Sequence, residues 1–130
     1  MAMLPRSEKR QSIRITKMID ATVERLGLAL VKGQSRVVAA LVVNVSREGV
    51  GLVAKESFDR LAKIRIAIHI NVETGLPDAD NPFKTDGEVR FCSLVGGGRG
   101  FRIGVQIEFR SGREAELWQE LVRRWSSQML

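Results

Sequence analysis

The sequence predicts a mainly β fold, a small antiparallel barrel or sandwich that carries a helix at its C-terminal end. Two observations support this prediction. Short segments that alternate apolar and polar residues are separated by turn-forming residues, and the segment from residue 111 onward changes to a helical period. With 130 residues, of which 44% are hydrophobic and 28% charged, the chain has the size and balance of a single globular domain.

The N-terminal half contains four strand-like segments. SIRITK and ATVERLGLALV come first, and in the second of these Leu26, Leu28 and Leu30 recur at period two. KGQS reads as a turn before RVVAALVVNV, a valine-rich strand that we expect to be largely buried, and EGVGLVAKE follows as a short strand.

The clearest alternation in the chain is KIRIAIHINV. It places the following side chains on one strand face: Ile64, Ile66, Ile68, Ile70 and Val72. The segment ETGLPDADNPFK carries two prolines and several turn formers, so we expect a long loop. DGEVRFCSLV and FRIGVQIEF then flank GGGRG, which predicts a hairpin with a glycine-rich connection.

The C-terminal segment SGREAELWQELVRRWSSQML has the period of an amphipathic helix. Its apolar stripe consists of Trp118, Leu121, Val122, Trp125 and Met129. Ser111 and Glu114 have the spacing of a capping box. We expect the two tryptophans to anchor the helix to the barrel or to a second subunit, and a homodimer through this helix is one prediction.

Charge, cysteine content and the lack of long apolar runs restrict the binding partners and the cellular compartment that we expect for the protein. The net charge of +6 favours anionic partners. Cys92 is the only cysteine, which excludes an internal disulfide and fits a reducing compartment. No apolar run approaches the ~18–20 residues of a membrane span, and MAMLPRSEKR lacks the apolar core of a signal peptide. We therefore expect a cytoplasmic protein.

The patterns of enzyme and metal sites are weak in this sequence. His69, the only histidine, falls on the outward face of a predicted strand with no metal ligand at a suitable spacing, and nothing local supports a pair with Cys92. DADN lacks the downstream glutamate of a calcium loop, and VGGGRG joins two strands instead of opening a helix. We expect no catalytic activity, no metal and no cofactor.

Two polar patterns favour ligand binding. In RQSIR, Arg10 and Arg14 are four residues apart, and Arg6 forms a second such pair with Arg10, although a solvated basic tail would look the same. In NVSREG, Asn44, Ser46 and Gly49 follow a valine-rich strand.

NVSREG can be interpreted in two ways. As a turn that ends a strand, Asn44 and Ser46 would bond to nearby backbone and Gly49 would adopt a positive φ. As part of a ligand site, all three residues would have a role.

Taken together, the two patterns resemble the motifs of the PilZ domain, a family of bacterial receptors for the second messenger cyclic di-GMP. The family carries an RxxxR element before the first barrel strand and a [D/N]xSxxG element later. DGEVRF and FRIGVQIEF resemble its late hairpin, and the resemblance spans about residues 9–125. It implies a six-stranded antiparallel PilZ-type β-barrel with a C-terminal α-helix. We expect a flexible basic tail over residues 1–8 and a single domain over residues 9–130.

The resemblance also implies a set of ligand-binding residues. For cyclic di-GMP these are Lys9, Arg10, Arg14, Asn44, Ser46 and Gly49, with Arg6, Arg47 and Phe91 as further candidates. Arginine suits a dianion with two guanines because it bonds bidentately to phosphate or to guanine O6 and N7 and stacks on bases. Ser46 offers a hydroxyl, and Gly49 allows close approach of the backbone. Phe91 also reads as a core residue of its strand.

Two of these residues depart from the more frequent form of the motifs. Asn44 replaces the aspartate that could accept from both N1–H and N2–H of guanine, so we expect lower affinity. Lys9 stands where the family frequently has arginine, and it lacks the planar fork that would favour a stacked ligand dimer.

The leading functional prediction is a non-enzymatic cyclic di-GMP effector. The ligand would order the N-terminal arginine segment over the barrel and change a surface that binds a protein partner, and the resemblance implies control of motility, exopolysaccharide or biofilm. One alternative is a protein-interaction module that keeps the PilZ fold without the ligand. Another is a small barrel that binds RNA or single-stranded DNA. The 5% aromatic content, with no tyrosine, argues against the nucleic-acid alternative.

Overall fold

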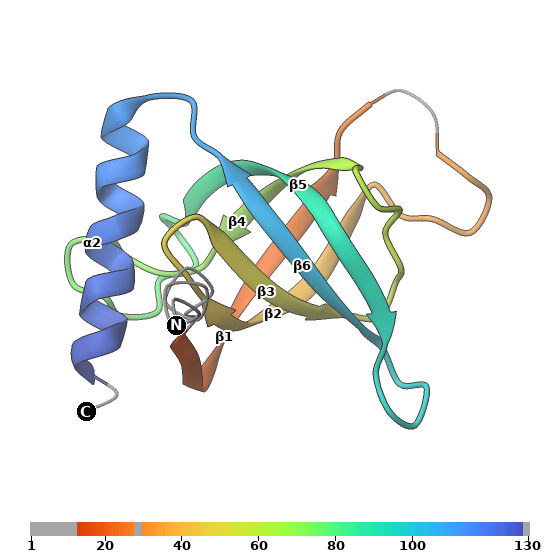
Figure 1. The fold of residues 1–130 in the computed structure, drawn as a ribbon, viewed down its shortest axis with the longest axis horizontal. Coiled ribbons are helices and arrows are strands. Elements are labelled where there is room, and N and C mark those ends of the chain that lie inside the picture. Colours follow the sequence, from red (N-terminus) through yellow and green to blue (C-terminus); the bar gives the residue numbers. More distant parts are fainter. Residues whose placement is uncertain (1–12, 28–29, 129–130) are drawn as a thin grey trace, which may run out of the picture.

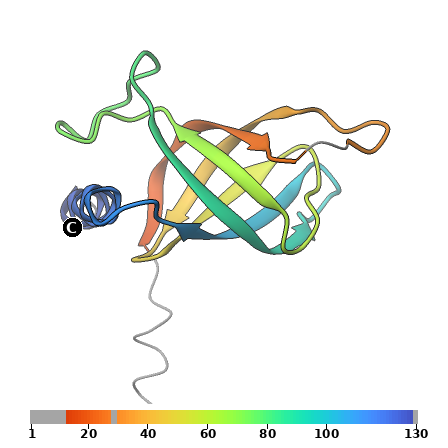
Figure 2. The same cartoon turned by 90° about the horizontal axis from the view of Figure 1, so that it is seen from above.

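The computed structural model describes residues 13–27 and 30–128. Six antiparallel strands form a closed barrel in the order β1-β2-β3-β6-β5-β4, and one helix lies beside one end of it (Figures 1 and 2). The elements are β1 (Ile13–Arg25), β2 (Val37–Val45), β3 (Gly49–Ala54), β4 (Lys63–Ile68), β5 (Phe83–Leu94), β6 (Phe101–Glu108) and α2 (Gly112–Gln128). This architecture confirms the predicted six-stranded barrel with a C-terminal helix.

The core fills the inside of the barrel with β-branched and leucine side chains. In the segment with the clearest alternation, Ile64, Ile66, Ile68 and Ile70 are at most 1% exposed, as predicted, whereas Val72 is only partly buried. Every second residue of β3 and β6 also points inward, including Val50, Leu52, Ile103 and Val105. The outward positions of β3 and β6 are therefore free to build a surface site.

The prediction of two separate strands at the N-terminus is wrong. From Ile13 onward, SIRITK and the first part of ATVERLGLALV form the single strand β1, whose pairing with β2 shifts register between Arg14 and Ile19. The strand ends at Arg25. The buried guanidinium of Arg25 bonds to Glu56 at 3.0 Å and to the carbonyl of Ser35 at 2.9 Å. The alternating leucines that lie in the described part of the chain are therefore not in a strand. Leu26 follows the last residue of β1, Leu30 is 41% exposed, and Leu28 lies outside the described residues.

The apolar stripe of α2 anchors the helix to the barrel, which confirms that part of the prediction. Trp118, Leu121 and Trp125 are at most 3% exposed. The Trp118 ring stacks on Phe83 of β5 with centroids 5.9 Å apart, and Val122 packs against the core at its edge. Among the described residues of α2 no large apolar side chain is exposed. The dimer through this helix stays a prediction, and Met129 lies outside the described residues.

Only one half of the predicted capping box forms. The Glu114 amide donates to Oγ of Ser111 at 3.2 Å. The Glu114 carboxylate accepts instead from the hydroxyl of Thr85 at 2.8 Å and from Nε of Arg110 at 3.1 Å. Glu114 therefore ties the first turn of α2 to β5. No helix in the described part of the chain has the length and apolar character needed to cross a membrane.

Candidate functional site

The turn between β2 and β3 contains the NVSREG motif and is held from several sides. The Ser46 amide donates to the carbonyl of Gly49 at 2.9 Å, and the Ile107 amide of β6 donates to the carbonyl of Glu48 at 2.8 Å. Nε1 of Trp118 in α2 donates to the carbonyl of Ser46 at 3.0 Å. The motif is thus fixed both to the barrel and to the helix.

Gly49 does not have the conformation predicted for a simple turn. Its φ is not positive, so a left-handed backbone is not the reason for glycine here. A Cβ at this position would lie 3.0 Å from the carbonyl oxygen of Val105 and 3.1 Å from Oγ of Ser46. Glycine is favoured here because β6 and the Ser46 side chain approach closely. The role of Gly49 in a ligand site stays a prediction.

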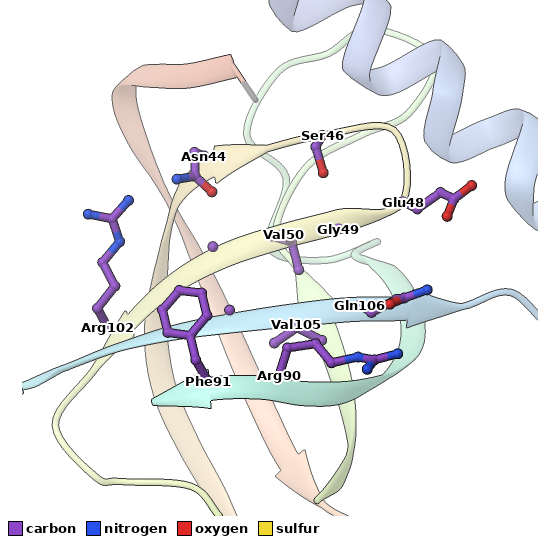
Figure 3. Close-up of a pocket in the computed structure, with 12 residues that line it drawn as sticks. Asn44, Ser46, Glu48, Gly49, Val50, Arg90, Phe91, Arg102, Val105 and Gln106 are labelled. Atoms are coloured by element: carbon purple, nitrogen blue, oxygen red, sulfur yellow. The ribbon is translucent and has the colours of Figure 1, made fainter. Parts of the chain in front are cut away.

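A shallow hollow of about 370 Å³ lies on the outer face of β3 and β6, beside this turn (Figure 3). Asn44, Ser46 and Gly49 line it together. The side chains of Asn44 and Ser46 form no hydrogen bond with other residues in the described ranges, so their polar groups are available to a ligand. The structure therefore brings Asn44, Ser46 and Gly49 of the NVSREG motif to one surface.

Two outward-facing glycines form the floor of the hollow. The strand register pairs Asn44 with Gly51, Gly51 with Gly104, and Gly104 with Phe91. A Cβ on Gly51 would overlap Oδ1 of Asn44, and a Cβ on Gly104 would overlap the ring of Phe91. The Asn44 carboxamide and the Phe91 ring therefore lie directly over backbone that has no side chain of its own.

Register shifts turn both of these side chains outward. One shift lies between Val42 and Asn44 in β2, and the other between Val89 and Phe91 in β5. Each bulge adds a residue and reverses the alternation that follows. The interpretation of Phe91 as a core residue is therefore wrong, since Phe91 is 50% exposed and Cys92 packs against the core instead.

The arginine motif is only partly described. In the β1–β2 register the backbone of Arg14, the second residue of β1, pairs with Asn44, so the second arginine of RQSIR has its backbone next to the hollow. Arg6, Lys9 and Arg10 lie outside the described residues. Arg47 is exposed on the turn and is not among the residues that line the hollow.

Four polar residues that line the hollow were missed by the sequence reasoning. They are Glu48, Arg90, Arg102 and Gln106. The alternation of FRIGVQ could have revealed Arg102 and Gln106, because both share the outward face of Gly104. Arg90 could not be placed in this way, since it lies at the bulge in β5.

Ion pairs occupy most charged side chains on the neighbouring outer face of β4, β5 and β6. Lys63 contacts Glu108 at 2.6 Å and Glu88 at 3.1 Å, and these carboxylates raise the pKa of the Lys63 ammonium. Arg65 contacts Asp86 at 2.8 Å, and the hydrogen bond from Arg65 holds the pKa of Asp86 below its ordinary value. Arg90 contacts Glu88 at 3.4 Å. Arg102 is exposed and has no such partner among the described residues.

Within the described ranges, no group of three or more His, Cys, Asp or Glu side chains could hold a metal ion. His69 lies on the outer side of the barrel after β4, where its amide bonds to the carbonyl of Asp20 at 2.9 Å. Cys92 accepts at its sulfur from the Phe58 amide at 3.5 Å.

Comparison with known proteins identifies the family. The family model of the PilZ domain matches residues 8–125, whereas no curated protein matches the sequence. The fold is similar to the PilZ domain of YcgR from Escherichia coli, solved with c-di-GMP. The two share 10% identity at a TM-score of 0.66, and the match covers 92% of this chain and 91% of that one.

Two longer proteins also contain this fold. The inhibitor of motility of Bacillus subtilis (MotI/DgrA) shares 18% identity at a TM-score of 0.60, and the match covers 92% of this chain and 52% of that one. MrkH of K. pneumonia shares 12% identity at a TM-score of 0.66, and the match covers 92% of this chain and 49% of that one. This chain thus spans about half the length of these two proteins. The chain belongs to the PilZ domain family, whose fold is that of cyclic di-GMP receptors and not of enzymes.

Proposed function

We propose that this protein is a cytoplasmic receptor that binds cyclic di-GMP in the hollow on β3 and β6. One observation carries the proposal. The backbone of Arg14 pairs with that of Asn44. Asn44, Ser46 and Gly49 line one hollow whose floor is formed by glycines. The backbone of Arg14, the second arginine of one motif, thus lies beside Asn44 of the other motif, thirty residues later in sequence.

The chemistry of these residues matches the ligand. Cyclic di-GMP carries two phosphate charges and two flat, hydrogen-bonding bases. Ser46 offers a hydroxyl and Asn44 a carboxamide, and both are free of other hydrogen bonds within the described residues. Arg10 and Arg14 would supply charge and bidentate bonds, each contributing on the order of 1.5–3 kcal/mol before the cost of ordering the chain is subtracted.

In the proposed mechanism the N-terminal segment covers the bound ligand. The segment joins the barrel at Ile13, which pairs with Val45 next to the hollow. A ligand in the hollow would therefore be within reach of Lys9 and Arg10, and binding would order these residues over it. The new surface, part ligand and part chain, would bind a protein partner that acts on motility, exopolysaccharide or biofilm.

Isothermal titration calorimetry with cyclic di-GMP tests the proposal. We expect saturable binding to the wild type, and none to Arg10→Ala or Arg14→Ala. The matched control is Arg60→Ala, which removes an exposed arginine that does not line the hollow. Absence of binding heat up to ~100 µM ligand would overturn the proposal. An unchanged Tm in excess ligand would then favour an interaction module that does not bind the nucleotide.

The stoichiometry tests the role of Lys9. An ammonium lacks the planar fork of a guanidinium and stacks less well on a base. We therefore expect one cyclic di-GMP per wild-type chain, and Lys9→Arg is the variant in which a second, stacked ligand would be favoured. Two ligands per wild-type chain would contradict this expectation.

A further inference from the structure

Arg102 is a cation of the hollow that pairs with no carboxylate among the described residues. It lies on β6 two residues before Gly104, on the same outward face, and it is exposed. No carboxylate in the described part of the chain pairs with it, whereas Arg90 in the same hollow contacts Glu88. In Figure 3 the Arg102 side chain rises at the end of the hollow where Asn44 and Phe91 also lie.

Phe91 provides a flat apolar surface at this end. One side of its ring covers Gly104, because a Cβ on that glycine would overlap the ring. The side chain is nevertheless 50% exposed, so much of the ring remains open to solvent. An exposed aromatic ring beside a cation is a stacking surface for a nucleobase.

Asn44 lies next to this surface but discriminates poorly between purines. A carboxylate only accepts hydrogen bonds, and it would therefore select the N1–H and N2–H donors of guanine. A carboxamide has both an acceptor and a donor and can rotate to present either. Asn44 can thus pair with the N1–H of guanine or with the unprotonated N1 of adenine. If the site is to select guanine over adenine, another residue has to distinguish O6 of guanine from the 6-amino group of adenine.

We propose that Arg102 is this specificity-determining residue, and that its guanidinium binds O6 and N7 of a guanine stacked on Phe91. A guanidinium has only donors, and guanine presents two acceptors at this edge. Adenine has an amino group at position 6, whose hydrogens would face those of Arg102, so one bond is lost and a repulsion is added. This inference rests on the proposed function and names how that site selects guanine.

Competition between three ligands isolates the contribution of position 6. Cyclic di-IMP and cyclic di-AMP both lack the 2-amino group, but only the first keeps O6 and N7 as acceptors. For the wild type we expect cyclic di-IMP to bind about tenfold or more tightly than cyclic di-AMP. For Arg102→Ala we expect this preference to fall to within about threefold, and cyclic di-GMP to bind about 10- to 100-fold more weakly.

Two further variants separate charge from geometry. Arg102→Lys keeps the charge but loses the fork, so most of the preference for cyclic di-IMP should disappear. Arg60→Ala removes one exposed positive charge away from the hollow, and its preference should equal that of the wild type. Because Arg102 is exposed, Arg102→Ala should melt at the wild-type temperature, which a thermal scan verifies.

The outcomes distinguish this inference from the proposed function. Wild-type protein that binds no cyclic di-GMP would overturn both. Wild-type binding with Arg102→Ala unchanged would overturn the role of Arg102 alone. So would equal weakening of all three ligands in Arg102→Ala, because Arg102 would then act on the phosphates and not on the base.

Discussion

The indole nitrogen of Trp118 donates a hydrogen bond to the main-chain carbonyl of Ser46 across 3.0 Å. Trp118 is fully buried, with its ring packed between Phe83 and Trp125. Ser46 lies 72 residues earlier, in the turn that borders the hollow. The C-terminal helix therefore takes part in positioning the candidate site although it contributes no side chain to the lining of the hollow.

Replacing Trp118 by phenylalanine should damage both stability and binding. Trp118→Phe removes the donor to Ser46 and leaves a small cavity, which we expect to lower the free energy of unfolding by about 1–3 kcal/mol. The turn would lose one of its fixed points, so cyclic di-GMP should also bind more weakly. Urea denaturation and calorimetry measure the two effects.

Trp125→Phe is the matched control for this change. Trp125 is buried in the same helix and makes an edge contact with Trp118 at 6.2 Å. This variant should lose stability while keeping the affinity for cyclic di-GMP. Equal losses of affinity in the two variants would show that general destabilisation, and not the bond to Ser46, is responsible.

A methyl group on Gly51 should weaken ligand binding with little effect on folding. The new Cβ would overlap Oδ1 of Asn44, and this partly exposed carboxamide can rotate away. We expect Gly51→Ala to bind cyclic di-GMP about tenfold more weakly, with a loss of unfolding free energy below about 1 kcal/mol.

Gly96→Ala is its control, since a Cβ there meets no atom within 4 Å and the glycine has no positive φ. Its affinity for cyclic di-GMP should match that of the wild type. Wild-type affinity in Gly51→Ala as well would mean that the position of Asn44 does not matter.

Asn44→Asp should increase affinity by about threefold to tenfold. A carboxylate can accept from both N1–H and N2–H of guanine, whereas the carboxamide accepts through one oxygen. Asn81→Asp adds the same charge in the loop after β4, at an exposed position outside the hollow, and should not tighten binding. Weaker binding of Asn44→Asp would indicate that residue 44 donates to a phosphate.

Acid should remove the contribution of the pair formed by Arg65 and Asp86. The hydrogen bond from Arg65 lowers the pKa of Asp86 in the folded state. The stabilisation is therefore present above the pKa of the unfolded state and is lost as the pH falls through the lower folded value. Asp86→Asn should melt about 1–3 °C below the wild type at pH 7, and this gap should narrow progressively as the pH falls below about 4, the ordinary pKa of an aspartate.

Asp59→Asn serves as the control for this pH series. Asp59 is exposed and its carboxylate forms no ion pair among the described residues. Its melting temperature should follow that of the wild type across the same range. A gap between wild type and Asp86→Asn that does not narrow between pH 7 and the acid end of the series would contradict the assignment to this ion pair.

The parts of the fold that could be predicted from the sequence are those that local periodicity determines. The alternation in β4 and β6 is unbroken, so Ile64, Ile66 and Ile103 could be assigned to the core. The end of β1 could not be predicted, because its surroundings are contacts distant in sequence, such as the bonds from Arg25 to residues 10 to 32 positions away. Leucines at period two continued past that point and suggested a longer strand.

The same distinction holds at the candidate site. Asn44, Ser46 and Gly49 could be grouped from the sequence because they lie in one turn. The outward position of Phe91 could not, because a one-residue bulge reverses the alternation. The place of Arg102 depends on the pairing of β3 with β6, two strands that are not consecutive. The spacing of residues in the sequence does not show which non-consecutive strands pair.

Closure of the barrel restricts how a partner can recognise this protein. Each of the six strands pairs with a neighbour on both sides over at least part of its length, so most of the described sheet is closed to the addition of a foreign strand. We therefore expect a partner to bind mainly side chains on the outside of the barrel or on α2, together with the surface that the ligand and the N-terminal segment would form. Ligand binding would then change the charge and shape of the surface around the hollow, and a partner would recognise this local change. The strand pairing of the barrel would stay the same.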